Sequence, residues 1–132
     1  MSKYFSIEEL CKSDTANIRG IDNTPTDEIK ENIQELIDNV LDPLREWYGK
    51  PIYVNSGYRC PELNTVVNGA KNSFHLKGCA ADIDVHDTAN NQELFNYIKS
   101  NLPFTELGWE AGGAWVHVAY DKTNLKKLIF YA

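Results

Sequence analysis

The chain has 132 residues, a mass of 15.0 kDa, 42% hydrophobic and 24% charged residues, and a net charge of −6. This length is typical of one domain with its own core, and the composition excludes intrinsic disorder and collagen-like repeats. The acidic charge argues against nucleic-acid binding and against a polybasic membrane patch. No apolar run is long enough for membrane insertion. We therefore expect a single globular domain spanning residues 1–132, with a monomer as the simplest state.

The beginning of the chain and its cysteines favour a reducing compartment. Residues 1–5 lack the apolar core of a secretory signal peptide, so synthesis in the cytoplasm is expected. Cys11, Cys60 and Cys79 are odd in number and form no C-x-x-C pair, which predicts thiols packed as small apolar residues.

The first half of the chain predicts mainly helix. Residues 6–9 read as a capping box that opens a short helix toward Cys11, whereas residues 13–24 are polar and predict a loop. From Thr26 to Gly49, apolar residues recur in steps of three and four, which predicts a long core helix. Pro43 removes one backbone donor and should kink the last turn of this helix.

The second half alternates between predicted strands and helices. Alternation in residues 80–85 places Asp82 and Asp84 on the face opposite the apolar side chains. Helices packed on a small, largely antiparallel sheet make the expected fold class α+β. The predicted elements are a strand at 51–55, helix at 61–67, strand at 80–85, helix at 91–102, hairpin of 104–110 and 114–120, and strand at 128–131.

The chain has three histidines, His75, His86 and His117, and histidine is the commonest metal ligand. His75 lies in a polar loop, and Asp82 follows seven residues later on the polar face of a predicted strand. Catalytic zinc takes three protein ligands and leaves a fourth position for water, and these two residues could supply two of the three. The alternative for any single histidine is a structural or exposed role.

The predicted hairpin brings a third histidine and a glutamate together. A two-residue turn at Gly112–Gly113 pairs Glu110 with Trp115 and Gly108 with His117. Glu110 and His117 are then diagonal neighbours on one face, about 7–8 Å apart, with room for a metal and its water. A one-residue slip would move Glu110 to the opposite face.

Arg59 follows a predicted strand and a glycine turn, which places it at the end of the sheet. Arginine is the natural two-pronged partner of a carboxylate, while the alternative is a surface salt bridge. Asn64 is either a helix-surface residue or a loop tether.

Together these segments resemble the M15 family of zinc peptidases, the D-Ala-D-Ala carboxypeptidase group that cuts bacterial cell-wall peptides and shares its fold with hedgehog proteins. The anchors are residues 5–10, residues 41–45, Ser56–Arg59 with Asn64, Ser73 and His75 through Asp82, and residues 115–118. The resemblance implies zinc bound by His75, Asp82 and His117. It also implies that Arg59 steadies a substrate oxygen, that Ser73 orients the peptide and that Trp115 walls the site beside His117.

One position departs from the family pattern. Many relatives place the catalytic acid three residues before the last histidine, where this chain has Ala114. In one branch, and in the hedgehog domain, the glutamate comes from the preceding strand, which implies Glu110 as the general base and Glu106 as the alternative. Asp84 and His86 have no place in the motif and are interpreted as structural.

The function implied is zinc-dependent hydrolysis of peptidoglycan stem peptides, as a carboxypeptidase or as an L-alanyl-D-glutamate endopeptidase. The small size and the lack of a signal resemble a phage or prophage endolysin that reaches the cell wall after release. Two alternatives remain: a zinc-containing module that binds wall peptides or a protein partner without cutting, and a structural phage domain whose histidines bind no metal.

Overall fold

A sheet with the strand order β1-β2-β4-β3-β5 organises the computed structural model, which describes residues 3–132. Its neighbouring strands are antiparallel except β3 and β5, which are parallel. This architecture confirms the predicted α+β fold with a largely antiparallel sheet. The strands are β1 (Tyr53–Ser56), β2 (Ala80–Asp84), β3 (Glu106–Glu110), β4 (Trp115–Ala119) and β5 (Leu128–Tyr131).

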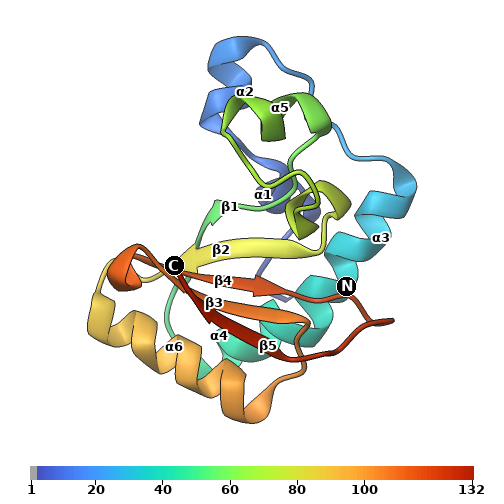
Figure 1. The fold of residues 1–132 in the computed structure, drawn as a ribbon. Coiled ribbons are helices and arrows are strands. Elements are labelled where there is room, and N and C mark those ends of the chain that lie inside the picture. The colour runs from blue at the N-terminus through green and yellow to red at the C-terminus, as the bar shows by residue number, and fades with distance from the viewer. Residues whose placement is uncertain (1–2) are drawn as a thin grey trace.

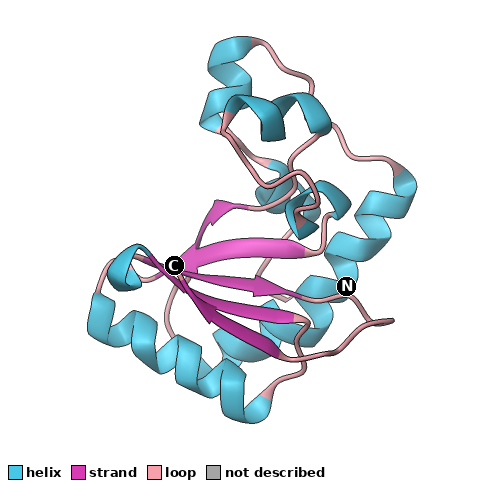
Figure 2. Cartoon of the chain, in the orientation of Figure 1, coloured by secondary structure: helices cyan, strands magenta, loops and turns pink. Residues whose placement is uncertain are grey.

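The helices lie in two places relative to the sheet (Figures 1 and 2). The long helices lie along the sheet, and α6 contacts β3 and β4, while the short helices α1, α2 and α5 gather beyond the β1 edge. The helical elements are α1 (Ile7–Cys11), α2 (Asp14–Arg19), α3 (Asp27–Leu36), the π-helical turn η1 (Ile37–Leu41), α4 (Asp42–Tyr48), α5 (Pro61–Val66), α6 (Thr88–Asn101), and the 3₁₀ turns η2 (Phe74–Lys77) and η3 (Ala111–Gly113).

The apolar face of the sheet forms the core together with the long helices. Side chains alternate between the two faces of a strand, so the buried Ile83, Val116, Val118 and Leu107 leave their intervening neighbours on the other face. Those neighbours are mainly polar or charged, and they carry the candidate site. The helix residues of the core include Leu36, Ile37, Val40, Leu41, Leu44, Leu94 and Ile98.

The long helical run differs from its prediction around Pro43. The π-helical turn η1 precedes the proline, and the Asp42 N–H donates to the Ile37 carbonyl. Proline has no N–H to offer the carbonyl four residues earlier, and its ring would clash with that group. A wider turn at this point accommodates the proline and lets the helix continue as α4.

The prediction of a loop over residues 13–24 is wrong, because this segment contains α2. Its ends are well capped: the Ser13 hydroxyl accepts from the Ala16 N–H at 3.1 Å, and Gly20 adopts a left-handed φ of 69°. Only Ala16 in this helix is buried, so no apolar periodicity marks it in the sequence. Similarly, α6 begins at Thr88 rather than residue 91, because Asp87 caps it through the Asn90 N–H.

The predicted hairpin register is confirmed. Glu110 pairs with Trp115 and Gly108 pairs with His117, on either side of a tight turn at residues 111–114. The strand β4 therefore starts at Trp115, one residue later than expected, without a change in which side chains share a face. β1, α5, β2 and β5 also lie within two residues of their predicted bounds.

Gly57, which directly follows β1, has no room for a side chain, because the backbone of Leu10 lies against it. A Cβ there would lie 2.1 Å from the Leu10 carbonyl oxygen, which accepts the Tyr58 N–H at 2.7 Å. We expect Gly57→Ala to lower the free energy of unfolding by about 1–3 kcal/mol, through overpacking and loss of this bond.

Denaturant unfolding measures this change. Gly20→Ala is the comparison, because no atom lies within 4 Å of its Cβ position and only its left-handed φ opposes the change. In Gly57→Ala, unlike Gly20→Ala, we also expect a weaker metal site, since the Gly57 carbonyl contacts His75. Equal effects on metal binding in the two variants would contradict this account.

Candidate metal centre

The candidate site lies on the polar face of the sheet, along one row of residues that pair across the strands. Asp82 on β2 pairs with His117 on β4, and His117 pairs with Gly108 on β3. The row continues to Ser56 on β1 and to Phe130 on β5. Because direct cross-strand partners point to the same face, the sheet register alone sets the Asp82 and His117 side chains next to each other.

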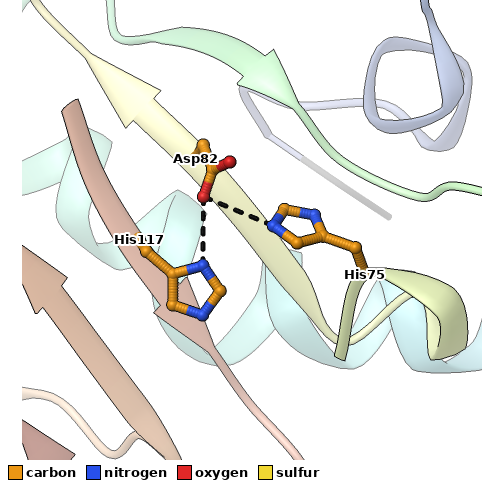
Figure 3. Close-up of side chains that lie close together, drawn as sticks. All are labelled: His75, Asp82 and His117. Atoms are coloured by element: carbon orange, nitrogen blue, oxygen red, sulfur yellow. Dashed lines mark hydrogen bonds and ion pairs between the residues drawn. The ribbon is translucent and has the colours of Figure 1, made fainter. Parts of the chain in front are cut away.

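His75 completes a three-residue cluster with this pair (Figure 3). Asp82 Oδ1 lies 3.0 Å from His117 Nδ1 and 3.3 Å from His75 Nε2. All three residues are buried, and their ligand atoms lie within 4.8 Å of one another. Within residues 3–132, this is the one group of histidine, cysteine or acidic side chains close enough to share a metal ion.

The backbone around His75 fixes which of its nitrogens faces the cluster. The Ser73 hydroxyl caps η2 by accepting the His75 N–H at 3.1 Å, and the His75 Nδ1 atom lies 2.7 Å from the Gly57 carbonyl oxygen. A carbonyl oxygen only accepts hydrogen bonds, so Nδ1 carries the proton. Nε2 therefore presents its lone pair toward Asp82.

The electrostatics of the cluster favour positive charge at its centre. Burial opposes the protonated form of His117, but hydrogen bonds to Asp82 and Glu106 outweigh it and raise the pKa of His117 to about 9. Burial likewise opposes the ionised form of Asp82, yet the hydrogen bond from His117 holds its pKa well below the usual range. The site thus stabilises a carboxylate and a cation side by side.

The donor set fits zinc. Two imidazole nitrogens and one carboxylate oxygen make a ligand set of the kind found in catalytic zinc sites, which keep a fourth position open. A tetrahedral zinc with ligand bonds of about 2.1 Å separates its ligand atoms by about 3.4 Å. The Asp82–His75 and Asp82–His117 distances of 3.3 and 3.0 Å are within a few tenths of an ångström of this value.

Arg59 lies at the site rather than in a surface salt bridge. Its side chain is 15% exposed, and Nη2 lies 3.7 Å from Asp82 Oδ2. Nε donates to the Ser56 hydroxyl and Nη1 donates to Asn64 Oδ1, each at 3.1 Å. Asn64 in turn donates to the Ala70 carbonyl at 3.1 Å, so this buried amide is a tether that orients the guanidinium.

A cavity of about 580 Å³ lies over the cluster and gathers the predicted site residues. Trp115 forms part of its wall, and its indole nitrogen is buried with no hydrogen-bond partner among the described residues. A neighbouring cavity of about 640 Å³, between β1 and the α1–α2 segment, shares Arg59 and Val67 with it. The predicted residues in the first cavity are Arg59, Ser73, His75, Asp82, Glu110, Trp115 and His117.

Two glutamates of β3 flank the His117 imidazole. Glu110 Oε2 lies 3.8 Å from Nδ1, the nitrogen that faces Asp82, whereas Glu106 Oε1 lies 3.1 Å from Nε2 on the far side of the ring. Asp84 and His86 lie outside the cluster and contact each other at 3.4 Å.

The sequence did not single out two contributors to the pocket. Phe130 lines it, with its ring centroid 5.6 Å from that of His117, and the Gly57 carbonyl orients His75. Phe130 reaches the pocket because β5 pairs with β3. No pattern in the sequence indicates that these two strands are neighbours. The contact between Glu106 and His117 could have been predicted from the sequence. Strand alternation puts Glu106 and Glu110 at equivalent positions on either side of Gly108, the partner of His117.

Comparison with known proteins identifies a family for this chain. Residues 3–119 match the family Peptidase M15, and this match covers most of the chain. The chain belongs to the M15 peptidase family. Membership supports a hydrolase of the metallopeptidase class. A comparison with curated proteins finds no match to this M15 peptidase. None of its described helices has the length and apolar character needed to cross a membrane.

The cluster predicts which histidine the metal needs. We expect His117→Ala to weaken zinc binding by more than about 100-fold, because loss of a direct ligand should exceed the 10–100-fold effect of losing an outer contact. Metal analysis of the purified M15 peptidase and chelator competition measure this. His86→Ala is the control and should keep full zinc content, since His86 is exposed and contacts Asp84 instead. Full zinc occupancy in His117→Ala would refute the assignment.

Proposed function

We propose that this M15 peptidase is a zinc enzyme that hydrolyses peptide bonds in the stem peptides of bacterial peptidoglycan, with zinc held by His75, Asp82 and His117. The observation that carries the proposal is the buried His–Asp–His cluster beneath a cavity that also holds a carboxylate and a guanidinium. Zinc, when bound, supplies Lewis acidity that polarises a carbonyl and lowers the pKa of water.

Glu110 is the proposed general base. Its carboxylate lies beside the His117 nitrogen that faces the cluster, at 3.8 Å, yet it is outside the three-donor set. From there it can take a proton from the attacking water and later return it to the leaving amine. Glu106, which contacts the opposite nitrogen, is on the wrong side of the ring for this role.

Arg59 is the proposed substrate anchor. Ser56 and Asn64 hold two of its nitrogens, and the guanidinium remains part of the cavity lining. A fork fixed in this way suits a substrate carboxylate or the developing negative charge on the attacked carbonyl. Trp115 and Ser73 would line the path of the peptide on the same cavity wall.

Two types of peptide bond in the stem peptide are candidate substrates. A carboxypeptidase releases a terminal D-alanine, whereas an L-alanyl-D-glutamate endopeptidase cuts within the stem. The two cavities that share Arg59 offer room for a substrate peptide on both sides of this residue. This arrangement is compatible with cleavage inside a peptide.

Digestion of purified peptidoglycan, followed by mass spectrometry of the new termini, tests the proposal and identifies the bond. Release of free alanine indicates a carboxypeptidase, and new amino termini within the stem indicate an endopeptidase. Binding to wall fragments without new termini from the zinc-loaded protein would refute hydrolysis and support a non-cutting module.

Removal of the general base should abolish activity while zinc remains. Glu110→Gln keeps the size of the side chain but cannot accept the proton, so we expect cleavage to fall by about 100-fold or more with full zinc content. Glu106→Gln is the matched control on the same strand and should have a comparatively mild effect. Normal cleavage by Glu110→Gln would exclude Glu110 as the base.

The Arg59 side chain should matter for turnover more than for folding. Arg59→Lys keeps the charge but loses the planar fork, so we expect a near-native melting curve and a lower kcat/KM, by about 10-fold or more. Steady-state kinetics and thermal unfolding together measure this. Unchanged kinetics on the preferred substrate would leave Arg59 with a structural role only.

A further inference from the structure

The two glutamates that flank His117 have different surroundings. Gly108 pairs directly with His117, so Glu106 and Glu110 occupy the two diagonal positions on β3 and approach the imidazole from opposite sides. Glu106 Oε1 lies 3.1 Å from Nε2, which is hydrogen-bond distance, whereas Glu110 Oε2 lies 3.8 Å from Nδ1. Of these two glutamates, Glu106 is the one that makes a direct hydrogen bond to the ring.

The orientation of the ring decides which nitrogen can bind a metal. Nδ1 of His117 points to Asp82 Oδ1, the same oxygen that faces His75 Nε2, and the second nitrogen points away from the cluster (Figure 3). Nδ1 is therefore the ligand atom. A neutral imidazole that offers the lone pair of Nδ1 must carry its proton on Nε2, where Glu106 is placed to accept it.

The second nitrogen of His75, the other histidine of the cluster, also has an oxygen acceptor. The Gly57 carbonyl oxygen lies 2.7 Å from His75 Nδ1 and leaves Nε2 free to face Asp82. Each histidine thus has an oxygen acceptor behind it, a backbone carbonyl for His75 and a carboxylate for His117. An acceptor on the second nitrogen fixes the tautomer and raises the basicity of a ligand histidine.

The surroundings of Glu106 strengthen its bond to His117. The Glu106 side chain is 22% exposed and the His117 side chain 9% exposed, so little water competes for the hydrogen bond. Phe130 packs beside the ring, with the two centroids 5.6 Å apart. In such a partly dry setting a charge-assisted hydrogen bond restrains the ring more than it would in water.

We propose that Glu106 is the positioning residue of the metal centre: its carboxylate accepts the Nε2–H of His117 and holds Nδ1 toward the metal. The inference rests on the proposed function, because it assumes that the cluster binds zinc. It assigns the two glutamates separate tasks, with Glu110 at the water and Glu106 behind the ligand.

Zinc affinity of the full chain, measured by chelator competition after removal of metal, tests the inference. We expect Glu106→Leu to bind zinc about 10–100-fold more weakly than the unchanged protein, the range typical of a lost outer contact. Glu106→Gln retains an oxygen acceptor and should lose less than Glu106→Leu. Glu93→Leu removes the same charge from an exposed position of α6 and should bind as tightly as the unchanged protein.

A second readout separates positioning from general structural damage. The visible absorption of the cobalt-substituted protein reports ligand geometry, and we expect it to change in Glu106→Leu and to be largely retained in Glu106→Gln. The melting curves of the metal-free forms should be similar. Glu106→Ala, made in parallel, provides the same test if Glu106→Leu does not fold.

The outcomes distinguish this inference from the proposed function. Equal zinc affinity in the unchanged protein, Glu106→Leu and Glu106→Ala would overturn the positioning role and leave the zinc enzyme intact. Loss of cleavage in Glu106→Gln with unaltered zinc affinity and cobalt spectrum would also overturn it, because Glu106 would then act in catalysis. Failure of the unchanged protein to bind zinc would overturn the proposed metal site itself.

Discussion

The pairing register of β3, β4 and β2 is the constraint on which the candidate site depends. Leu107 on β3 faces Val118 on β4 in the core, and both side chains are fully buried. The same register sets Gly108 opposite His117 on the other face, and His117 opposite Asp82. A slip of one residue would expose the apolar side chains and turn the glutamates of β3 into the core. Burial of the core therefore also fixes the geometry of the candidate metal cluster.

Charge balance explains why this group of side chains suits a divalent cation. Asp82, Glu106 and Glu110 contribute three carboxylates within contact of His117, and Arg59 contributes one permanent positive charge. With neutral histidines, two negative charges remain uncompensated in a partly buried site, which is energetically costly. In the metal-free protein, the proton held by His117 offsets part of this charge. A zinc ion with two positive charges would balance both negative charges. The acidic surroundings and the proposed ligand set therefore both favour a divalent cation.

The sequence predicts those parts of the site that follow from strand periodicity. Alternation in β2 was enough to place Asp82 on the polar face of its strand, and the glycine turn was enough to place His117 and Glu110 on one face of the hairpin. The pairing of β2 with β4, which brings Asp82 next to His117, comes from the structure. Periodicity does not predict which hydrogen-bond partner each imidazole nitrogen has, because the partner depends on side-chain torsion angles and on the neighbouring backbone. For this reason the separate tasks that we propose for Glu106 and Glu110 rest on the distances to Nε2 and Nδ1. Helix α2 escaped prediction because its caps stabilise it without an apolar stripe.

Gly108 lies between β5 and the candidate metal centre, and its lack of a side chain lets the two come into contact. A Cβ at this position would lie 2.4 Å from the Phe130 ring, so only glycine lets the aromatic side chain pack beside His117. Phe130 belongs to β5, which follows the region matched to the peptidase family. The candidate ligands and the proposed base thus come from the family region, whereas the Phe130 side chain comes from a strand outside it. Because Phe130 and Glu106 restrain the same imidazole from different directions, the final strand helps to determine how rigidly His117 is held.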